Sequence, residues 1–182
     1  MAVLISQVER FDASADRVLE HIRGYRASEV VFRTASFVGD FSAVWLAIGV
    51  LYGVGVDGNP WHALGFGVLM GVESLVVNQG IKRLFRRTRP TETGDPRFIV
   101  RKPRSSSFPS GHASSAFFAA TLLTVWAGWA WAPVWFVIAL VVAISRAVVR
   151  IHHASDVVAG IITGLVLAQV ALAFGADRLF TG

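Results

Sequence analysis

Residues 133–175 read PVWFVIALVVAISRAVVRIHHASDVVAGIITGLVLAQVALAFG, a stretch in which two long apolar runs flank a short polar link. The runs cover residues 133–150 and 156–175. An α-helix rises about 1.5 Å per residue, so about 20 residues cross a hydrocarbon core of about 30 Å. The stretch therefore predicts two membrane-spanning helices, with ionisable side chains at the point where the chain turns back.

Three earlier segments, at residues 35–56, 61–81 and 112–131, have a similar length and composition. The chain of 182 residues is 54% hydrophobic and only 16% charged, whereas soluble domains average roughly 25% charged residues. We therefore expect an all-α fold, a polytopic membrane helix bundle of about five transmembrane helices. This bundle would form one domain over residues 34–182.

The N-terminal segment, residues 1–33, has a different pattern. Apolar residues recur there at spacings of three and four, and charged residues fill the other positions. This pattern predicts an amphipathic helix, or two short helices with a break near Phe11 and Asp12. The helix could lie in the headgroup layer or pack on the rest of the protein. The apolar stripe comprises Leu4, Val8, Phe11, Ala15, Val18 and Ile22.

Composition also excludes several classes of protein. The chain has no cysteine, which excludes a disulfide-stapled fold and Cys-ligated zinc or iron–sulfur sites. Its formal charge of +5 would suggest nucleic acid, but the basic residues cluster between apolar runs. That placement favours anionic lipid or phosphate as the partner, and no nucleic acid.

The basic residues are also distributed unevenly between the two sides of the predicted bundle. If all five segments cross, every Lys and Arg except Arg178 lies on the side of the N-terminus, the 82–111 link and the 150–156 link. The positive-inside rule then places this side in the cytoplasm. We expect a multi-pass protein of a bacterial cytoplasmic membrane with its functional groups on the cytoplasmic side.

Two polar clusters lie at the two ends of the 82–111 link. In KRLFRRTRP, Lys82 and Arg89 are seven residues apart, which places them on one helix face before Pro90 ends the helix. In SSSFPSGHASS, Ser110 and Gly111 lead into a helix whose free N–H groups form an anion site. His112, at the start of that helix, can exchange a proton near neutral pH.

The third cluster is SRAVVRIHHASD. Arg146 ends an apolar helix, and Asp156 follows His152 by four residues and His153 by three. A carboxylate against one imidazole nitrogen fixes the tautomer and leaves the other nitrogen free as a nucleophile or base. Helical spacing permits either histidine to pair with Asp156.

Together the clusters supply three cations, backbone N–H donors, one hydroxyl, histidines and a carboxylate. That inventory suits a phosphate dianion, because phosphoryl transfer depends mainly on positioning and on neutralising the equatorial oxygens. Two histidines suggest one nucleophile and one acid for the leaving group. We predict no metal site, since no carboxylate cluster accompanies them and zinc usually needs three protein ligands. No cofactor is implied.

The order and spacing of these residues resemble the three-part signature of the type 2 phosphatidic acid phosphatase superfamily, which includes lipid phosphate phosphatases, prenyl diphosphate phosphatases and vanadium haloperoxidases. The match spans residues 82–156. It comprises Lys82, Arg89 and Pro90, then Pro109, Ser110, Gly111 and His112, then Ser145, Arg146, His152 and Asp156.

The resemblance implies a metal-independent phosphatase with a division of labour among these residues. His152, which the signature selects over His153, would attack phosphorus to form a phosphohistidine, and Asp156 would orient it. His112 would protonate the leaving oxygen and later activate water. The remaining implied phosphate-binding residues are Lys82, Arg89, Ser110, Gly111 and Arg146.

The substrate and several other roles stay open at the level of sequence. A phospholipid phosphate such as phosphatidic acid or phosphatidylglycerol phosphate, and a polyprenyl diphosphate or polyprenyl-sugar phosphate, present the same terminal group. A vanadate-dependent oxidase is disfavoured because its relatives are soluble, and a non-catalytic lipid-binding protein is a further alternative.

For Glu73, inside the second apolar segment, an interhelical hydrogen bond is favoured over a functional role. Gly160 and Gly164 could pack helices within one chain or between two chains.

Overall fold

In the computed structural model, residues 2–90 and 105–180 are described, and these residues form helices, turns and short links without a strand. The α-helices are α1 (Ala2–Arg23), α2 (Arg26–Val38), α3 (Ala43–Gly55), α4 (Pro60–Leu75), α5 (Gly111–Ala127), α6 (Ala132–Val148) and α7 (Ala154–Ala173). The shorter helical turns are η1 (Asp40–Ser42), η2 (Val76–Gly80), η3 (Ile81–Leu84), η5 (Trp129–Trp131) and η6 (Ala176–Phe180). The predicted all-α class is confirmed.

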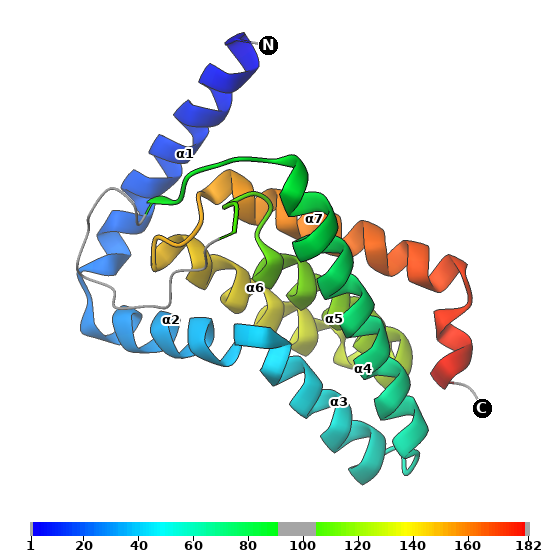
Figure 1. The fold of residues 1–182 in the computed structure, drawn as a ribbon. Coiled ribbons are helices and arrows are strands. Elements are labelled where there is room, and N and C mark those ends of the chain that lie inside the picture. Colours follow the sequence, from blue (N-terminus) through cyan, green and yellow to red (C-terminus); the bar gives the residue numbers. More distant parts are fainter. Residues whose placement is uncertain (1, 91–104, 181–182) are drawn as a thin grey trace.

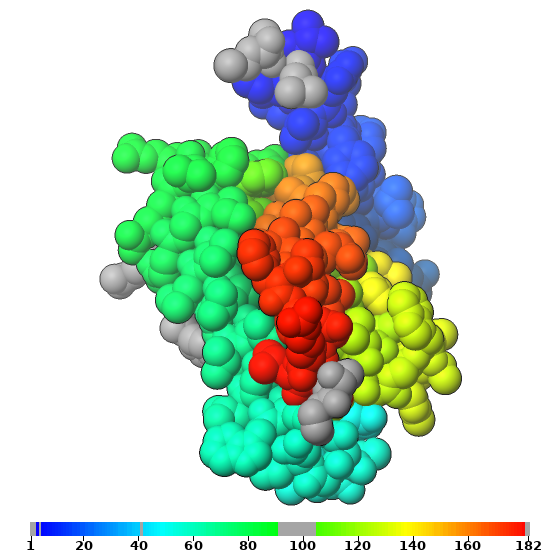
Figure 2. Space-filling model, turned by 90° about the vertical axis from the view of Figure 1, so that its right-hand side faces the viewer, coloured from blue at the N-terminus to red at the C-terminus, as the bar shows by residue number. Residues whose placement is uncertain are grey.

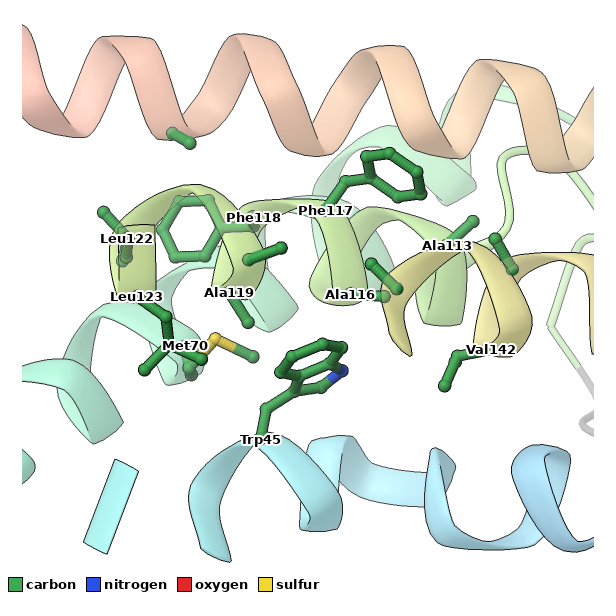
Figure 3. Packing of buried hydrophobic residues seen from close by; sticks show 14 of the residues in the cluster. Trp45, Met70, Ala113, Ala116, Phe117, Phe118, Ala119, Leu122, Leu123 and Val142 are labelled. Atoms are coloured by element: carbon green, nitrogen blue, oxygen red, sulfur yellow. The ribbon is translucent and has the colours of Figure 1, made fainter. Parts of the chain in front are cut away.

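Helix α5 lies at the centre of the bundle, enclosed by α3, α4, α6 and α7 (Figure 1). It is apolar on nearly all sides, as a fully buried helix must be. Figure 3 shows Trp45 of α3 directed towards α5 below Ala116 and Ala119, and Met70 of α4 next to Leu123. The candidate site residues at the start of α5 thus lie on the most deeply buried of the described helices.

Three helical segments are long and apolar enough to cross a membrane, namely Pro60–Leu84, Trp129–Val148 and Ala154–Ala173. A fourth span results if α2 and α3 are counted together, although they meet at an angle of 68°. Helix α5 has 17 residues. The membrane bundle is confirmed, but the count of five spans is not.

The outer faces of these helices are apolar. Large hydrophobic side chains such as Leu51, Val68, Val137 and Ile162 are more than half exposed. Single exposed apolar residues are normal in soluble proteins, but a continuous apolar cover is not. The exposed faces of α3, α4, α6 and α7 therefore suit contact with lipid.

The first predicted span, residues 35–56, is not one straight helix. The helix breaks at η1, where Ser42 has a φ of 58° in the left-handed region. A non-glycine residue in that region interrupts the helical hydrogen bonds and redirects the chain. The break brings Asp40 to the inner side of the bend between α2 and α3. Helix α2 also runs across the expected domain boundary at residues 33 and 34.

The predicted helix through Lys82 and Arg89 is wrong. Helix α4 gives way to the π-helical turn η2 and then the 3₁₀ turn η3, which ends at Leu84. Phe85 is extended, with φ −120° and ψ 140°. Lys82 and Arg89 therefore reach the same region from a helical turn and from an extended segment. Sequence spacing alone could not reveal this change of conformation.

Of the two alternatives for the N-terminal segment, the structure has the uninterrupted helix, since α1 is continuous to Arg23 without a break near Phe11 and Asp12. Its apolar stripe does not face inward throughout, because Phe11 is 49% and Val18 is 68% exposed. Asp12 and Arg23 are buried instead. The first turns of α1 project from the end of the molecule opposite the α3–α4 turn, as Figures 1 and 2 show. The later turns pack on the bundle through polar contacts and through the apolar side chains of Leu19 and Ile22.

The small residues of α7 pack against α5 within one chain. A Cβ atom on Gly160 would lie 2.4 Å from the backbone oxygen of Ser110, and one on Gly164 would lie 2.2 Å from that of Ser114. Beside this contact, the Ser114 hydroxyl donates to Glu73 Oε1, which is the interhelical hydrogen bond favoured by the sequence. The close approach of α5 and α7 thus depends on glycine.

Replacing Gly164 by Ala is expected to destabilise the protein by about 1–3 kcal/mol, because the added Cβ forces α5 and α7 apart. Gly71→Ala in α4 is the matched control, since its Cβ would meet no atom within 4 Å and alanine favours helix. Thermal unfolding in detergent compares the two variants. Equal stability of Gly164→Ala and wild type would contradict the assigned packing.

Candidate active site

The three clusters meet at the end of the bundle beneath α1, where the links 85–90, 105–110 and 149–153 lie close together (Figure 1). His152 lies in the link between α6 and α7, and its backbone N–H donates to the oxygen of Arg146 at 3.1 Å. Arg150 precedes it with a φ of 59°, which turns the chain sharply after α6. His152 and Asp156 are nearly fully buried.

The contacts of His152 assign its tautomer. Arg89 Nη1 lies 3.3 Å from His152 Nε2. A guanidinium group can only donate hydrogen bonds, so Nε2 must be the unprotonated acceptor and the ring proton lies on Nδ1. The lone pair of Nε2 therefore faces the cationic part of the site. This is the nitrogen that a nucleophilic role requires.

Ser107 connects His152 to Asp156, and sequence reasoning missed this residue. The Ser107 hydroxyl donates to Asp156 Oδ2 at 2.5 Å and lies 3.4 Å from His152 Nδ1. The direct distance from His152 Nδ1 to Asp156 Oδ2 is 3.8 Å. Asp156 thus holds the imidazole partly through the serine. The only available signal was the position of Ser107 within the SSSFPSG run.

Asp156 is also held by α7 itself. His153 is the N-cap of α7, and its backbone N–H donates to Asp156 Oδ2 at 2.9 Å. His152 therefore precedes the helix, and the expected helical pairing between it and Asp156 does not apply. The two histidines differ in role here, since His153 contacts the carboxylate through its backbone.

The cationic wall combines Arg89, Lys82 and the start of α5. Arg89 is anchored by the backbone oxygens of Ile151 at 3.0 Å and Ser106 at 3.1 Å. At Gly111, a Cβ atom would lie 3.3 Å from Lys82 Nζ. The absence of a side chain at Gly111 therefore allows the ammonium group to approach the N-terminus of α5.

Ser110 and Arg146 complete the predicted set. Ser110 is the N-cap of α5, since its hydroxyl accepts from Ala113 N at 3.4 Å, and its own backbone N–H donates to the backbone oxygen of Asp156 at 2.9 Å. Arg146 Nη1 donates to the backbone oxygen of Ser36 at 3.2 Å. Arg146 Nε is buried without a hydrogen-bond partner among the described residues, so one donor remains for an anion.

His112 faces a carboxylate that sequence reasoning also missed. His112 Nε2 lies 2.8 Å from Asp40 Oδ1, and Arg146 Nη1 lies 4.0 Å from the same oxygen. Asp40 comes from the bend between α2 and α3, about 70 residues before the signature residue that it contacts. No motif in the sequence links the two positions.

Charged side chains connect helix α1 to this site. Arg87 donates to Asp156 Oδ1 and to Asp12 Oδ2, each at 2.5 Å. Asp12 also accepts from the backbone N–H of Ser155 at 2.8 Å. Arg87 is not part of the three-part signature, yet it joins α1 to the carboxylate that orients His152.

Two hollows open beside the site. The larger has a volume of about 1150 Å³, lies along the bend between α2 and α3, and is mostly apolar, with Asp40 and Arg146 among its lining residues. The smaller, of about 340 Å³, lies beside α1 and reaches His152 and Pro90. The larger hollow can hold a lipid chain whose polar end lies near Arg146.

Burial lowers the pKa of His152 to about 3. Asp156 opposes this shift, whereas the nearby cations Arg89, Arg146 and Lys82 increase it. His152 is therefore neutral at physiological pH. A neutral imidazole surrounded by cations is suited to attack a bound anion and unsuited to act as a permanent charge.

The same shift predicts a dependence of stability on pH. The unfolded state binds a proton at His152 below pH about 6.5 and the folded state does not, so wild type loses up to about 1.4 kcal/mol per pH unit on acidification below that value. His152→Gln is expected to lack this contribution. Unfolding midpoints measured at pH 7.5 and pH 5 test it, and an equal acid-induced loss in both proteins would contradict it.

Comparisons with known proteins show which family this chain resembles. The family model described as the PAP2 superfamily matches residues 62–179. The decaprenylphosphoryl-5-phosphoribose phosphatase of Mycolicibacterium smegmatis is 35% identical over 133 residues, covering 70% of this chain and 68% of that protein. The enzyme of the same name from Mycobacterium tuberculosis is 30% identical over 150 residues, covering 80% of each chain.

A solved structure resembles the whole bundle. The crystal structure of a transmembrane PAP2 type phosphatidylglycerolphosphate phosphatase from Bacillus subtilis aligns with a TM-score of 0.74 at 26% identity, covering 92% of this chain and 86% of that chain. The predicted resemblance to type 2 phosphatidic acid phosphatases is confirmed. With a family model that covers most of its length and a membrane relative of the same fold, the chain belongs to the PAP2 superfamily.

Proposed function

We propose that the chain removes a terminal phosphate from a membrane lipid through a phosphohistidine on His152. As a PAP2 member with a transmembrane relative, it is a membrane lipid phosphate phosphatase. The observation that carries the mechanism is the contact of the unprotonated His152 Nε2 with the Arg89 guanidinium at 3.3 Å. This contact places a nucleophile where a phosphoryl group would be bound.

The reaction proceeds in two steps. In the first, His152 Nε2 bonds to phosphorus, the bond from phosphorus to the lipid oxygen breaks, and His112 gives its proton to that oxygen. In the second, water attacks phosphorus, His112 takes a proton from the water, and the phosphorus–nitrogen bond breaks. Free phosphate and the neutral form of His152 result. Arg89, Lys82 and Arg146 would neutralise the phosphoryl oxygens, together with the N-terminus of α5.

The substrate has two candidate classes. A phospholipid phosphate is supported by the likeness to a phosphatidylglycerolphosphate phosphatase. A polyprenyl-linked sugar phosphate is supported by the likeness to the two decaprenylphosphoryl-5-phosphoribose phosphatases. Both classes present a phosphomonoester and a long apolar chain, and the mostly apolar hollow beside Arg146 accommodates either.

Phosphate release from a panel of these lipids tests the proposal. Wild type in detergent with EDTA is expected to release phosphate from at least one lipid, and the preferred lipid identifies the class. His112→Ala is expected to lose most of this activity. Lipid binding by folded protein without phosphate release would overturn the enzyme and leave the non-catalytic alternative. Release that requires an added metal would contradict the histidine mechanism.

We further propose that the site faces the cytoplasm from a bacterial cytoplasmic membrane. The excess of Lys and Arg at this end of the bundle supports that orientation. Because the chain has no cysteine, single-cysteine variants can test it with a membrane-impermeant maleimide. Val56→Cys, near the exposed α3–α4 turn, is expected to react in intact spheroplasts and Gln7→Cys is not. The reverse pattern would overturn this orientation.

A further inference from the structure

Asp40 occupies a position that no part of the three-part signature describes. It lies in η1, between α2 and α3, and its side chain is 30% exposed. Its Oδ1 atom is 2.8 Å from His112 Nε2 and 4.0 Å from Arg146 Nη1. The carboxylate thus contacts one proposed catalytic histidine and one proposed phosphate-binding arginine.

The contact fixes the proton on His112. An ionised carboxylate only accepts hydrogen bonds, so His112 Nε2 must carry the proton and Nδ1 carries the lone pair. The two histidines of the site are therefore oriented in opposite senses. His152 is protonated on Nδ1, facing Ser107 and Asp156, whereas His112 is protonated on Nε2, facing Asp40.

We infer that Asp40 is the positioning residue of the acid–base histidine, an inference that rests on the proposed function. Asp40 holds the ring of His112 and stabilises its doubly protonated form. In that form Nδ1–H gives its proton to the departing lipid oxygen as the phosphorus–oxygen bond breaks. Nδ1 takes a proton back from water as the phosphorus–nitrogen bond breaks. The site then contains two histidine–carboxylate pairs, one that orients the nucleophile and one that orients the acid–base group in both steps of the reaction.

The charges around His112 explain why such a partner is needed. Burial, and then the charges of Arg146 and Lys82, lower the pKa of His112 to about 4, whereas Asp40 opposes this shift. Among the described groups that act on His112, Asp40 is the one that favours the protonated form. Asp40→Asn is therefore expected to shift the alkaline limb of the kcat profile to lower pH.

Two substrates separate an acid–base role from a general loss of structure. With a lipid phosphate, Asp40→Asn is expected to slow formation of the phosphoenzyme roughly 10- to 100-fold, because an alkoxide needs a proton to leave. With p-nitrophenyl phosphate, formation is expected to stay within about 3-fold of wild type, because nitrophenolate leaves without a proton. A burst of nitrophenolate followed by slow turnover is then expected. Equal slowing on both substrates would overturn the inference.

Matched variants complete the test. Asp40→Glu is expected to restore part of the lipid rate, and Asp177→Asn, an equal charge change at an exposed position far from the site, is expected to leave it unchanged. In a His112→Ala background, Asp40→Asn is expected to add little, because the two residues act as a unit. Additive losses in the double variant would contradict a shared role.

A spectroscopic measurement distinguishes failure of this inference from failure of the proposed function. In protein labelled with ¹⁵N-histidine, His112 is expected to give the Nε2–H tautomer in wild type and a mixture of tautomers in Asp40→Asn. This readout needs no substrate. An inactive wild type with the expected tautomer would refute the phosphatase and retain the pair. An Nδ1–H tautomer in an active wild type would refute the pair alone.

Discussion

The His152→Ala variant is expected to lose phosphate release by about 10⁴-fold or more. The reason is that the substitution removes the nitrogen that bonds to phosphorus, and other catalytic groups cannot compensate for a missing nucleophile. The effect should appear in kcat, with the lipid still bound through Arg89, Lys82 and Arg146. Steady-state kinetics and lipid binding, measured on the same detergent preparation, provide the comparison.

His153→Ala is the matched control for this variant. It removes the neighbouring imidazole but keeps the backbone N–H that donates to Asp156. We expect it to retain activity within about 10-fold of wild type. If His153→Ala were as inactive as His152→Ala while both remained folded, the assignment of the nucleophile would be wrong.

The Asp156→Asn variant is expected to lose about 10³-fold in kcat and to be less stable than wild type. Its carboxylate accepts from Ser107 at 2.5 Å and from the His153 backbone at 2.9 Å, and it pairs with Arg87 at 2.5 Å. An amide nitrogen at either oxygen position would break one of these contacts. The substitution also removes the negative charge that stabilises the cationic imidazole during attack.

Asp12→Asn separates the structural part of this loss from the catalytic part. Asp12 binds the same Arg87 and the N-terminal turn of α7, but it does not contact His152. We expect it to lower the unfolding temperature by a similar amount while keeping kcat within about 10-fold of wild type. Comparable losses of kcat in the two variants would show that Asp156 has only a structural role.

Much of the site could be predicted from the sequence, because its residues belong to short runs with fixed spacing. Lys82, Ser110 and His152 each lie next to the end of an apolar segment, and the order of those segments places the ends on one side of the bundle. The N-cap position of Ser110 could be predicted from the same pattern. The chain folds accordingly, with α5 at its centre.

Two of the residues that were missed, Asp40 and Asp12, contact the site from distant parts of the chain. Asp40 reaches His112 only because the chain bends after α2, and Asp12 reaches Arg87 only because α1 packs on the links between helices. Neither contact has a local signature, since each pairs polar side chains across many residues. The helical spacing of Lys82 and Arg89 also misled, because η2 and η3 end the helix before Arg89.

Apolar periodicity did not predict correctly which face of helix α1 is buried. Its sequence predicts an apolar inner face, but Asp12 and Arg23 are buried and Phe11 is exposed. Arg23 donates to the backbone oxygens of Val148 and Ala147 at 2.9 and 2.8 Å. These oxygens lie at the end of α6, where the last carbonyl groups of a helix lack a full set of intrahelical donors, although the Ala147 oxygen also accepts from Arg150 N at 3.2 Å. Hydrogen bonds to these oxygens favour a buried arginine over an apolar residue at position 23.

The most direct test of the account is the identity of the phosphorylated residue during turnover. Wild type is mixed with a lipid carrying a ³²P-labelled terminal phosphate, quenched in alkali within the first turnover, and digested for peptide mapping. The account predicts a single acid-labile, alkali-stable label on the peptide that contains His152, and no label in His152→Ala. Turnover of the lipid without any labelled peptide, or with the label on another residue, would contradict the proposed mechanism.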